Sequence, residues 1–209
     1  MPITGNDLIS IIQAISKRMH DERDALCELD RAIGDGDHGV AMDIGWTSVS
    51  ESVEALRDPS VTEIFHTASQ VFLRSVGATV GPLYATGLLD MSVWARDHQC
   101  LTSNDILPLF ETFVNGLERR GRATMGEKTM IDVWVPALNA FRMAIPNGSS
   151  MAVHAALQAA REGYLSTANM VAVKGRASRL GTRSEGHVDP GARSAYLLLE
   201  TVAQWFSDY

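Results

Sequence analysis

Hydrophobic residues recur at three- and four-residue steps along most of the chain, which is the spacing of one face of an amphipathic α-helix. The first such stripe lies between residue 6 and about residue 29 and is formed by Leu8, Ile11, Ile12, Ile15 and Met19. The sustained alternation that marks β-strands is nearly absent. The pattern therefore predicts an all-α protein.

Turn and cap residues divide the periodic stretches into eight expected helices. Asp58-Pro59 ends the second helix, Ser60 caps the third, and Ser103 or Asn104 caps the fifth. The expected helices cover about residues 6–29, 40–56, 61–75, 82–97, 103–121, 130–145, 150–170 and 192–206. Because the links between most of them are short, we expect an antiparallel arrangement within one domain spanning residues 1–209.

A loop rich in aspartate and glycine follows the first expected helix. Residues 29–39 read LDRAIGDGDHG and contain three carboxylates and three glycines. Mg²⁺ prefers carboxylate oxygens and keeps water or phosphate as its remaining ligands, and glycine allows the sharp turns that aim neighbouring carboxylates at one centre. We predict a metal site that holds phosphates, with Asp30, Asp35 and Asp37 as ligands; the simpler alternative is a solvated turn.

Other phosphate and metal motifs do not fit these residues. Gly34, Gly36 and Gly39 have the spacing of a dinucleotide-binding turn, but the residues before them are helical rather than a strand. An EF-hand beginning at Asp35 would need a glutamate where Trp46 stands. The chain also lacks a Walker phosphate loop with its lysine.

Charge and cysteine content narrow the class of protein. The 209 residues carry a formal net charge of -7, which argues against nucleic acid as a partner because phosphate backbones require a basic face. Cys27 and Cys100 suit free thiols in a reducing compartment. The sequence has no apolar run long enough to span a membrane and no export signal at its start, so we expect a cytoplasmic protein without a membrane partner.

The stretch before the last expected helix is unusually long for a helical bundle. Residues 174–191 carry Lys174, Arg176, Arg179 and Arg183 in a chain that is acidic overall. Such a segment can close over phosphates as a lid, since guanidinium groups pair well with phosphate oxygens. The alternative is a mobile surface loop with solvated arginines.

Four separated motifs resemble those of one protein family. They are residues 29–39, residues 128–136 (KTMIDVWVP), residues 174–178 (KGRAS) and residues 186–192 (GHVDPGA). Together they resemble the nucleotide-binding L subunit of dihydroxyacetone kinases. The resemblance extends over nearly the whole chain, and the motifs stand in the family's order.

The resemblance implies an eight-helix antiparallel barrel that binds ADP or ATP at one end through two Mg²⁺ ions held by Asp30, Asp35 and Asp37. It assigns no general base, and it makes Arg176 the candidate helper for phosphate charge. By the family pattern, the nucleotide-binding residues are His38, Gly39, Val40, Ala41, Thr79, Val80, Gly121, Met130, Arg176, Asp189, Pro190 and Gly191.

The family pattern also implies a partner protein. A separate K subunit binds the phosphoryl acceptor, a small ketone, and ADP is either exchanged for ATP or kept and rephosphorylated by a phosphotransferase-system protein. Family members often carry Asn at position 41 and Ser at position 80, whereas this chain has Ala41 and Val80. These changes remove polar contacts near the phosphates and put the nucleotide affinity in question.

Two other functions are compatible with the same residues. A di-magnesium phosphatase would use the carboxylates to activate water and would need no partner. An ADP-sensing regulatory protein would bind the nucleotide and support no transfer. The ketone and the phosphoryl donor are not determined by this chain, because the substrate site would belong to the partner.

Overall fold

The computed structural model describes residues 2–77 and 79–208, so positions 1 and 209 of the expected domain, and position 78, lie outside the described residues. Within this part of the chain the secondary structure is helical, with one isolated β-bridge between Ile3 and Leu101. The all-α prediction is confirmed. The α-helices are α1 (Gly5–Asp21), α2 (Arg23–Ile33), α3 (His38–Glu54), α4 (Val61–Ser75), α5 (Val80–Trp94), α6 (Ser103–Gly121), α7 (Ile131–Ala144), α8 (Ser149–Ser166) and α9 (Pro190–Asp208).

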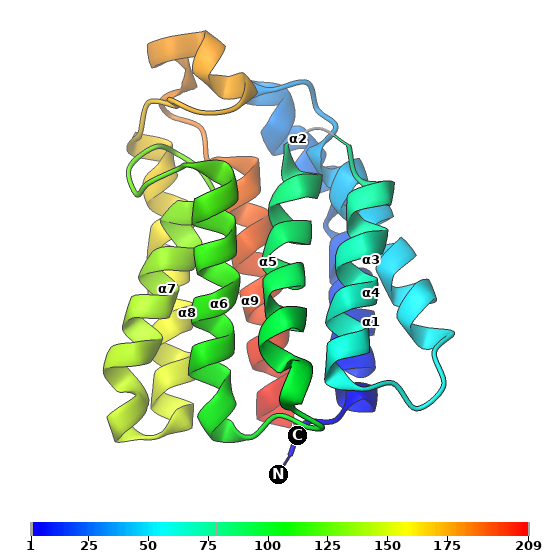
Figure 1. Ribbon diagram of the computed structural model, residues 1–209. Coiled ribbons are helices and arrows are strands. Elements are labelled where there is room, and N and C mark those ends of the chain that lie inside the picture. Colours follow the sequence, from blue (N-terminus) through cyan, green and yellow to red (C-terminus); the bar gives the residue numbers. More distant parts are fainter. Residues whose placement is uncertain (1, 78, 209) are drawn as a thin grey trace.

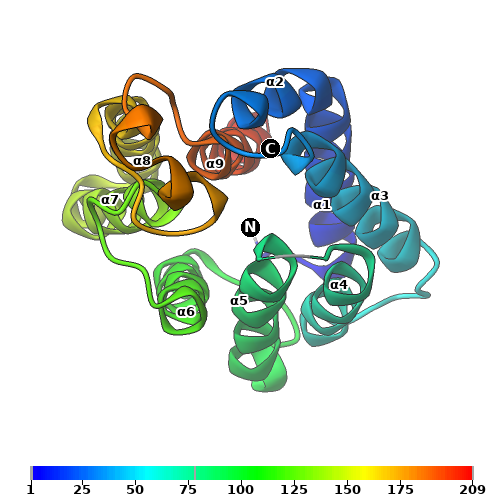
Figure 2. The same cartoon turned by 90° about the horizontal axis from the view of Figure 1, so that it is seen from above.

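Eight of these helices form an up-and-down barrel (Figure 1). Each helix packs against the next one in the order α1, α3, α4, α5, α6, α7, α8 and α9, and α9 packs against α1 to close the ring (Figure 2). The remaining helix, α2, lies at one end of the barrel and packs against α3 and α9. The eight-helix antiparallel barrel implied by the resemblance is therefore confirmed, with α2 as an additional helix.

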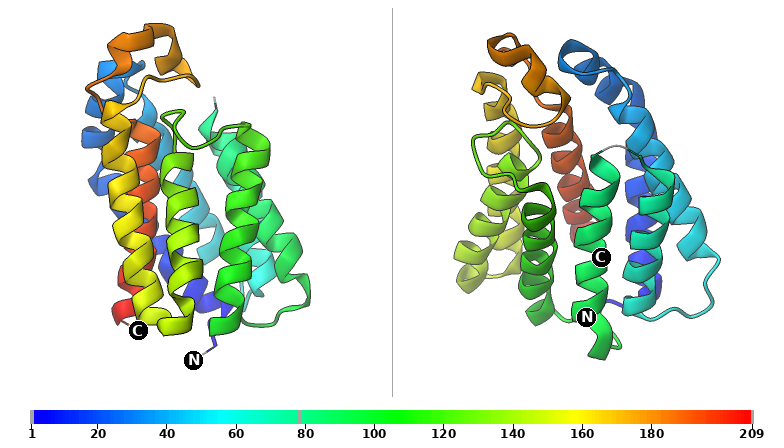
Figure 3. Two further views of the ribbon diagram at one scale, coloured as in Figure 1. Left: turned by 90° about the vertical axis from the view of Figure 1, so that its left-hand side faces the viewer. Right: turned by 45° about the horizontal axis from the view of Figure 1, so that its top comes forward.

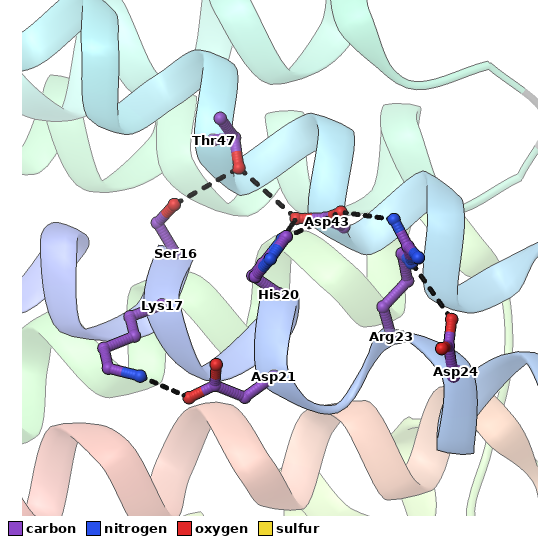
Figure 4. Close-up of polar contacts among 8 residues, drawn as sticks. All are labelled: Ser16, Lys17, His20, Asp21, Arg23, Asp24, Asp43 and Thr47. Atoms are coloured by element: carbon purple, nitrogen blue, oxygen red, sulfur yellow. Dashed lines mark hydrogen bonds and ion pairs between the residues drawn. The ribbon is translucent and has the colours of Figure 1, made fainter.

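The long first helix expected over residues 6–29 is divided into α1 and α2. Glu22 ends α1, and its amide donates to the carbonyl oxygens of Arg18 and His20. Asp43 of α3 contacts both sides of this break, with 3.2 Å between Asp43 Oδ1 and His20 Nδ1 and 3.8 Å between Asp43 Oδ2 and Arg23 Nη1 (Figure 4). These polar contacts help to set α2 at the end of the barrel, above α3.

Aromatic side chains line the barrel interior. The Trp46 and Phe72 rings lie 5.3 Å apart, Phe72 and Tyr84 5.6 Å, and Phe113 and Trp134 4.9 Å, each pair edge to face. This packing, with the aliphatic side chains around it, supplies the apolar burial that holds the eight helices together. None of the described helices is both long and apolar enough to span a membrane.

Helices α4 and α6 begin at N-terminal capping residues. Ser60 caps α4 in a capping box with Glu63, as expected. The cap of α6 is Thr102, one residue before Ser103 and two before Asn104, the two expected caps. The carboxylate of Asp105 accepts from the Thr102 amide at 2.7 Å. The cap is set by this reciprocal pair rather than by the first polar residue of the helix.

The long connection between α8 and α9 is partly helical. It contains the short 3₁₀ segments η3 (Thr167–Asn169), which takes the place of the last residues of the helix expected over 150–170, and η4 (Arg176–Ser184), which lies in the stretch expected to be a loop. It lies over the end of the barrel that also carries α2 (Figures 1 and 3). Two further 3₁₀ segments, η1 (Ala95–Asp97) and η2 (Ile145–Asn147), follow α5 and α7.

The barrel topology gives its two ends different electrostatic character. Helices α3, α5, α7 and α9 all begin at the end that carries α2 and η4. The N-terminus of a helix carries a partial positive charge and amide groups that no carbonyl of the helix accepts. Four such termini make this end of the barrel favourable for anions.

Candidate metal and nucleotide site

The aspartate-rich loop joins α2 to α3 at this end of the barrel. Asp30, in the last turn of α2, is buried, and its Oδ2 accepts hydrogen bonds from the amides of Asp37 at 2.9 Å and His38 at 3.2 Å. Asp35 and Asp37 are exposed. One carboxylate oxygen from each of the three aspartates lies within 4.8 Å of the others. The predicted ligand residues are thus close together, as a hard divalent cation requires.

Two glycines allow this arrangement. A Cβ atom at Gly34 would lie 2.1 Å from Oδ1 of Asp30, so any side chain there would displace the carboxylate. Gly36 has a φ of +80°, which other residues rarely adopt. The loop therefore needs glycine at both positions to keep the carboxylates together.

Arg176 comes to the same cluster from the α8–α9 connection. Its Nη1 atom forms an ion pair with Asp35 and lies 3.2 Å from Oδ1 and 3.3 Å from Oδ2 of Asp37. These carboxylates raise the pKa of the Arg176 guanidinium, so the side chain stays charged. The cationic segment thus reaches the acidic loop. Arg179 and Arg183 are exposed and do not line the pocket described next.

An open pocket of about 480 Å³ adjoins the carboxylates, a volume in the range of small-molecule binding sites. It lies between the α2–α3 loop, the starts of α5 and α9, the α6–α7 connection and η4. Most of the predicted site residues line it. They are Asp30, Asp37, His38, Ala41, Thr79, Val80, Gly121, Met130, Arg176, Asp189, Pro190 and Gly191.

Three predicted site residues do not line this pocket. Asp35 stands beside it and contacts Arg176. Val40 is 43% exposed on the outside of α3. Gly39 is buried between helices, where a Cβ atom would lie 1.9 Å from the carbonyl oxygen of Arg23. The absence of a side chain at Gly39 thus allows α3 to pack closely against α2.

The pocket also contains residues to which the sequence analysis gave no role. Lys128, Thr129, Ile131 and Lys174 belong to motifs quoted for the resemblance, and Leu83 and Leu117 lie within expected helices. Three of these residues are aliphatic: Leu83, Leu117 and Ile131. With Met130, these three aliphatic side chains provide an apolar wall suited to a flat heterocyclic base. The remaining lining residues are Ile33, Gly77, Ala123, Gly175 and Ala177.

His38 is held by a residue that sequence reasoning did not identify. Its Nε2 atom lies 2.9 Å from Oγ of Ser194 on α9, and the Ser194 hydroxyl is 3.0 Å from the carbonyl oxygen of Gly191. Burial lowers the pKa of the imidazole, while Asp30 and Asp37 oppose this shift. The hydrogen bond ties the start of α3 to the first turn of α9. A contact between positions 156 residues apart leaves no periodic signal in the sequence.

Asp189 caps α9 and has an unusual protonation equilibrium. Its Oδ2 accepts from the amide of Ala192 at 2.8 Å. Burial raises the pKa of the Asp189 carboxyl to about 7; the Ala192 hydrogen bond and Lys128 act against this rise, and Asp132 and Asp30 add to it. A carboxyl whose pKa is raised by folding favours the protonated form in the folded state.

This carboxyl predicts a pH dependence of stability. The contribution of Asp189 is fully present below pH about 4 and is lost as the pH rises towards 7, because the unfolded chain ionises first. In Asp189→Asn the amide oxygen can still accept from Ala192, and we expect the variant to gain stability relative to the unaltered protein across this range. Urea unfolding of both proteins at several pH values measures the difference. Parallel pH profiles would contradict the assignment.

Comparisons with known proteins agree with this geometry. Residues 32–204 match the DAK2 domain family. The chain is 39% identical over 188 residues to the "PEP-dependent dihydroxyacetone kinase 1, ADP-binding subunit DhaL" of Listeria innocua, covering 90% of each chain. It is 35% identical over 205 residues to the "PEP-dependent dihydroxyacetone kinase, ADP-binding subunit DhaL" of Escherichia coli K12, covering 97% of this chain and 98% of that protein.

The fold has a solved counterpart. A crystal structure of the dihydroxyacetone kinase from C. freundii in complex with AMP-PNP and Mg²⁺ superimposes with a TM-score of 0.75 at 20% identity. The superposition covers 98% of this chain and 34% of that one, so this chain corresponds to about a third of the larger protein. At this identity the likeness establishes the fold. On the match over residues 32–204 and the similarity to full-length relatives, this chain belongs to the DAK2 domain family.

Proposed function

We propose that this chain is the nucleotide-binding subunit of a dihydroxyacetone-type kinase, which passes a phosphoryl group to a small ketone held by a separate K subunit. The observation that carries the proposal is the pocket at one end of the barrel, where an apolar wall, a carboxylate cluster and Arg176 adjoin one another. The apolar wall suits the base, the carboxylates suit the metal, and Arg176 suits the phosphates. The similarity to two ADP-binding subunits supports the same function.

The carboxylates fit a metal-bound nucleotide by their chemistry. Asp30, Asp35 and Asp37 would hold two Mg²⁺ ions, which, when bound, neutralise phosphate charge and orient the phosphates for transfer. Asp30 is fixed by the two amides that it accepts from, whereas the exposed Asp35 and Asp37 can adjust to the ions. Phosphoryl transfer needs positioning and charge neutralisation more than covalent chemistry by a side chain, so no general base is assigned to this chain.

The backbone at the helix starts supplies the rest of the phosphate site. The N-terminal turns of α3 and α5 bring the amides of Gly39, Val40 and Val80 to the pocket end of the barrel. Amides at a helix N-terminus bind phosphate oxygens without a polar side chain. We expect such amides to replace part of the polar contact that Ala41 and Val80 do not provide.

For the phosphoryl donor, we favour a phosphotransferase-system protein that rephosphorylates bound ADP. Both relatives are named as dependent on PEP, which supports a donor other than free ATP. The pocket is lined by the loops and helix starts at one end of the barrel, so a donor protein and a K subunit could approach the same phosphates in turn.

Reconstitution tests the proposed function. The chain is loaded with Mg-ADP and mixed with the Escherichia coli K subunit, dihydroxyacetone, PEP and the phosphotransferase proteins, and formation of the phosphorylated ketone is followed. We expect product only when both this chain and the K subunit are present. Release of phosphate without a K subunit would indicate the phosphatase, and nucleotide binding without transfer to any K subunit would indicate the sensor.

Arg176 should affect metal binding and phosphoryl transfer in opposite directions. In Arg176→Met the cation paired with Asp35 and Asp37 is removed, so we expect Mg²⁺ without nucleotide to bind several-fold more tightly. Transfer should fall by about tenfold or more, because a cationic contact to the phosphates is lost. Arg179→Met, on the same segment but away from the pocket, is the control. A variant that transfers phosphate at the original rate would refute the role of Arg176.

A further inference from the structure

The two ends of the α8–α9 connection meet in a closed neck. The chain leaves the barrel after α8 and returns to α9 about twenty residues later, and between these points it carries Arg176. The neck consists of residues 167–172, which leave α8, and residues 184–189, which return to α9. Three hydrogen bonds join these two segments: Asp189 N to Thr167 Oγ1 at 3.0 Å, Gly186 N to Ala168 O at 2.7 Å, and Ala172 N to Ser184 Oγ at 2.9 Å.

Lys128 reaches this neck from a different part of the chain. It belongs to the α6–α7 connection, lines the pocket and is only 1% exposed. Its Nζ atom donates to the carbonyl oxygen of Thr167 on one side of the neck and to that of His187 on the other. A single ammonium group therefore binds both ends of the connection.

The backbone around Lys128 is arranged for this contact. Lys128 has a φ of +61°, a left-handed conformation that is uncommon for residues other than glycine. The buried carboxylate of Asp132 holds it there by accepting from the amides of Gly126 at 2.5 Å and Thr129 at 2.8 Å. A residue held in an unfavourable backbone conformation by surrounding hydrogen bonds points to a function for its side chain.

Glu127 extends the contact beyond the neck. Its carbonyl oxygen accepts from the amide of Val173 at 3.5 Å, and its carboxylate lies 3.8 Å from Nζ of Lys174. The connection is thus held at its neck by Lys128 and at the start of its basic part by Glu127. Arg176 lies two residues beyond this second contact.

The charge of a buried lysine needs compensation here. Burial lowers the pKa of the Lys128 ammonium, and Asp189, Glu185 and Asp132 raise it. Because the pKa of the Asp189 carboxyl is itself raised to about 7, the contribution of Asp189 grows as this carboxyl ionises. The charged ammonium has three donors, and two of them bind the two carbonyl oxygens. Methionine has no donor and can make neither contact.

We propose that Lys128 is a positioning residue that closes the neck of the α8–α9 connection and so holds Arg176 at the carboxylate cluster and residues 189–191 at the pocket wall. This closure of the neck by Lys128, called the clamp below, is independent of the proposed function. Its consequence for phosphoryl transfer rests on that function.

Limited digestion with trypsin tests the clamp without any activity. The basic part of the connection contains four cleavable residues, Lys174, Arg176, Arg179 and Arg183, and exposed Arg57 between α3 and α4 is an internal reference site. In Lys128→Met we expect cleavage within 174–183 to be about tenfold faster or more, with cleavage at Arg57 unchanged, because only the neck opens. Lys17→Met, whose side chain is 76% exposed, is the matched control.

The digestion has a clear contrary outcome. Cleavage of the connection at the rate seen in Lys17→Met would overturn the proposal, and so would equal acceleration at Arg57, since that indicates global loss of stability. If Lys128→Met does not fold, hydrogen exchange of the unaltered protein decides. The amides of Ala172, Gly186 and Asp189 are expected to exchange slowly and together; exchange as fast as that of exposed loop amides would equally overturn it.

A double-mutant cycle tests the consequence for catalysis. If Lys128 acts through Arg176, then Arg176→Met should lower the transfer rate much less in the Lys128→Met background than in the unaltered protein. Additive effects would show that Lys128 does not position Arg176. Absence of transfer in the unaltered protein would instead reject the proposed function while leaving the digestion result valid.

Discussion

Asp37→Asn is expected to weaken Mg²⁺-dependent ADP binding by about 100-fold or more, which corresponds to about 2.7 kcal/mol, while the helical fold is retained. Asp37 lines the pocket, and its carboxylate lies with those of Asp30 and Asp35 within 4.8 Å. Asparagine keeps the size of the side chain and removes the negative charge that the cation requires. The Asp37 side chain is 60% exposed, so its replacement does not disturb the packing of the core. Calorimetry measures the affinity, and circular dichroism the helix content.

An exposed carboxylate on α2, outside the cluster, provides the control. The side chain of Asp24 is 90% exposed and forms an ion pair with Arg23 (Figure 4). Asp24→Asn should therefore bind Mg-ADP like the unaltered protein. Equal affinity of Asp37→Asn and Asp24→Asn would show that the loop is a solvated turn rather than a metal site.

Gly39→Ala is expected to lower the free energy of unfolding by about 3 kcal/mol, at the upper end of the usual range for overpacking. The added Cβ would lie 1.9 Å from the carbonyl oxygen of Arg23 and 2.9 Å from Sγ of Cys27. Because the nearer atom belongs to the backbone, α3 and α2 must separate. Asp30 moves with α2, so Mg-ADP binding should weaken as well. Urea unfolding and calorimetry measure the two effects.

Gly77 offers a comparison at the same end of the barrel. A Cβ there would meet no atom within 4 Å, and its φ is not positive. Gly77→Ala should therefore change the free energy of unfolding by only about 0.5 kcal/mol or less. If Gly39→Ala were equally mild, the close packing of α2 on α3 would not be what requires glycine at this position.

Local sequence patterns were sufficient to predict most of the helices. The stripe of α1 that contains Leu8, Ile11 and Ile15 is buried in the protein core as expected, and Ser60 caps α4. The break between α1 and α2 was not predicted, because periodicity continues on both sides of it. Asp43, from another helix, contacts His20 on one side of the break and Arg23 on the other, and such a distant contact leaves no local pattern.

The candidate site was predicted only in part, because local patterns show residues that are close in sequence but not contacts between distant ones. The aspartates are adjacent in sequence, so their cluster could be expected from residues 29–39 alone. Lys128 and Ser194 act on residues 39 or more positions away, and no local pattern marks such contacts. The segment η4 was not predicted, because residues 174–185 are mostly polar and lack the hydrophobic spacing of an amphipathic helix.

Calorimetric titration of the nucleotide-stripped chain with ADP, first with Mg²⁺ and then with a chelator, shows whether the carboxylate cluster binds a nucleotide through metal. We expect one ADP to bind per chain in the presence of Mg²⁺ and this binding to disappear with the chelator, since the three carboxylates can hold phosphates only through a cation. Binding that survives the chelator would contradict the metal-bridged site. Absence of binding under both conditions would contradict the claim that this pocket is a nucleotide site.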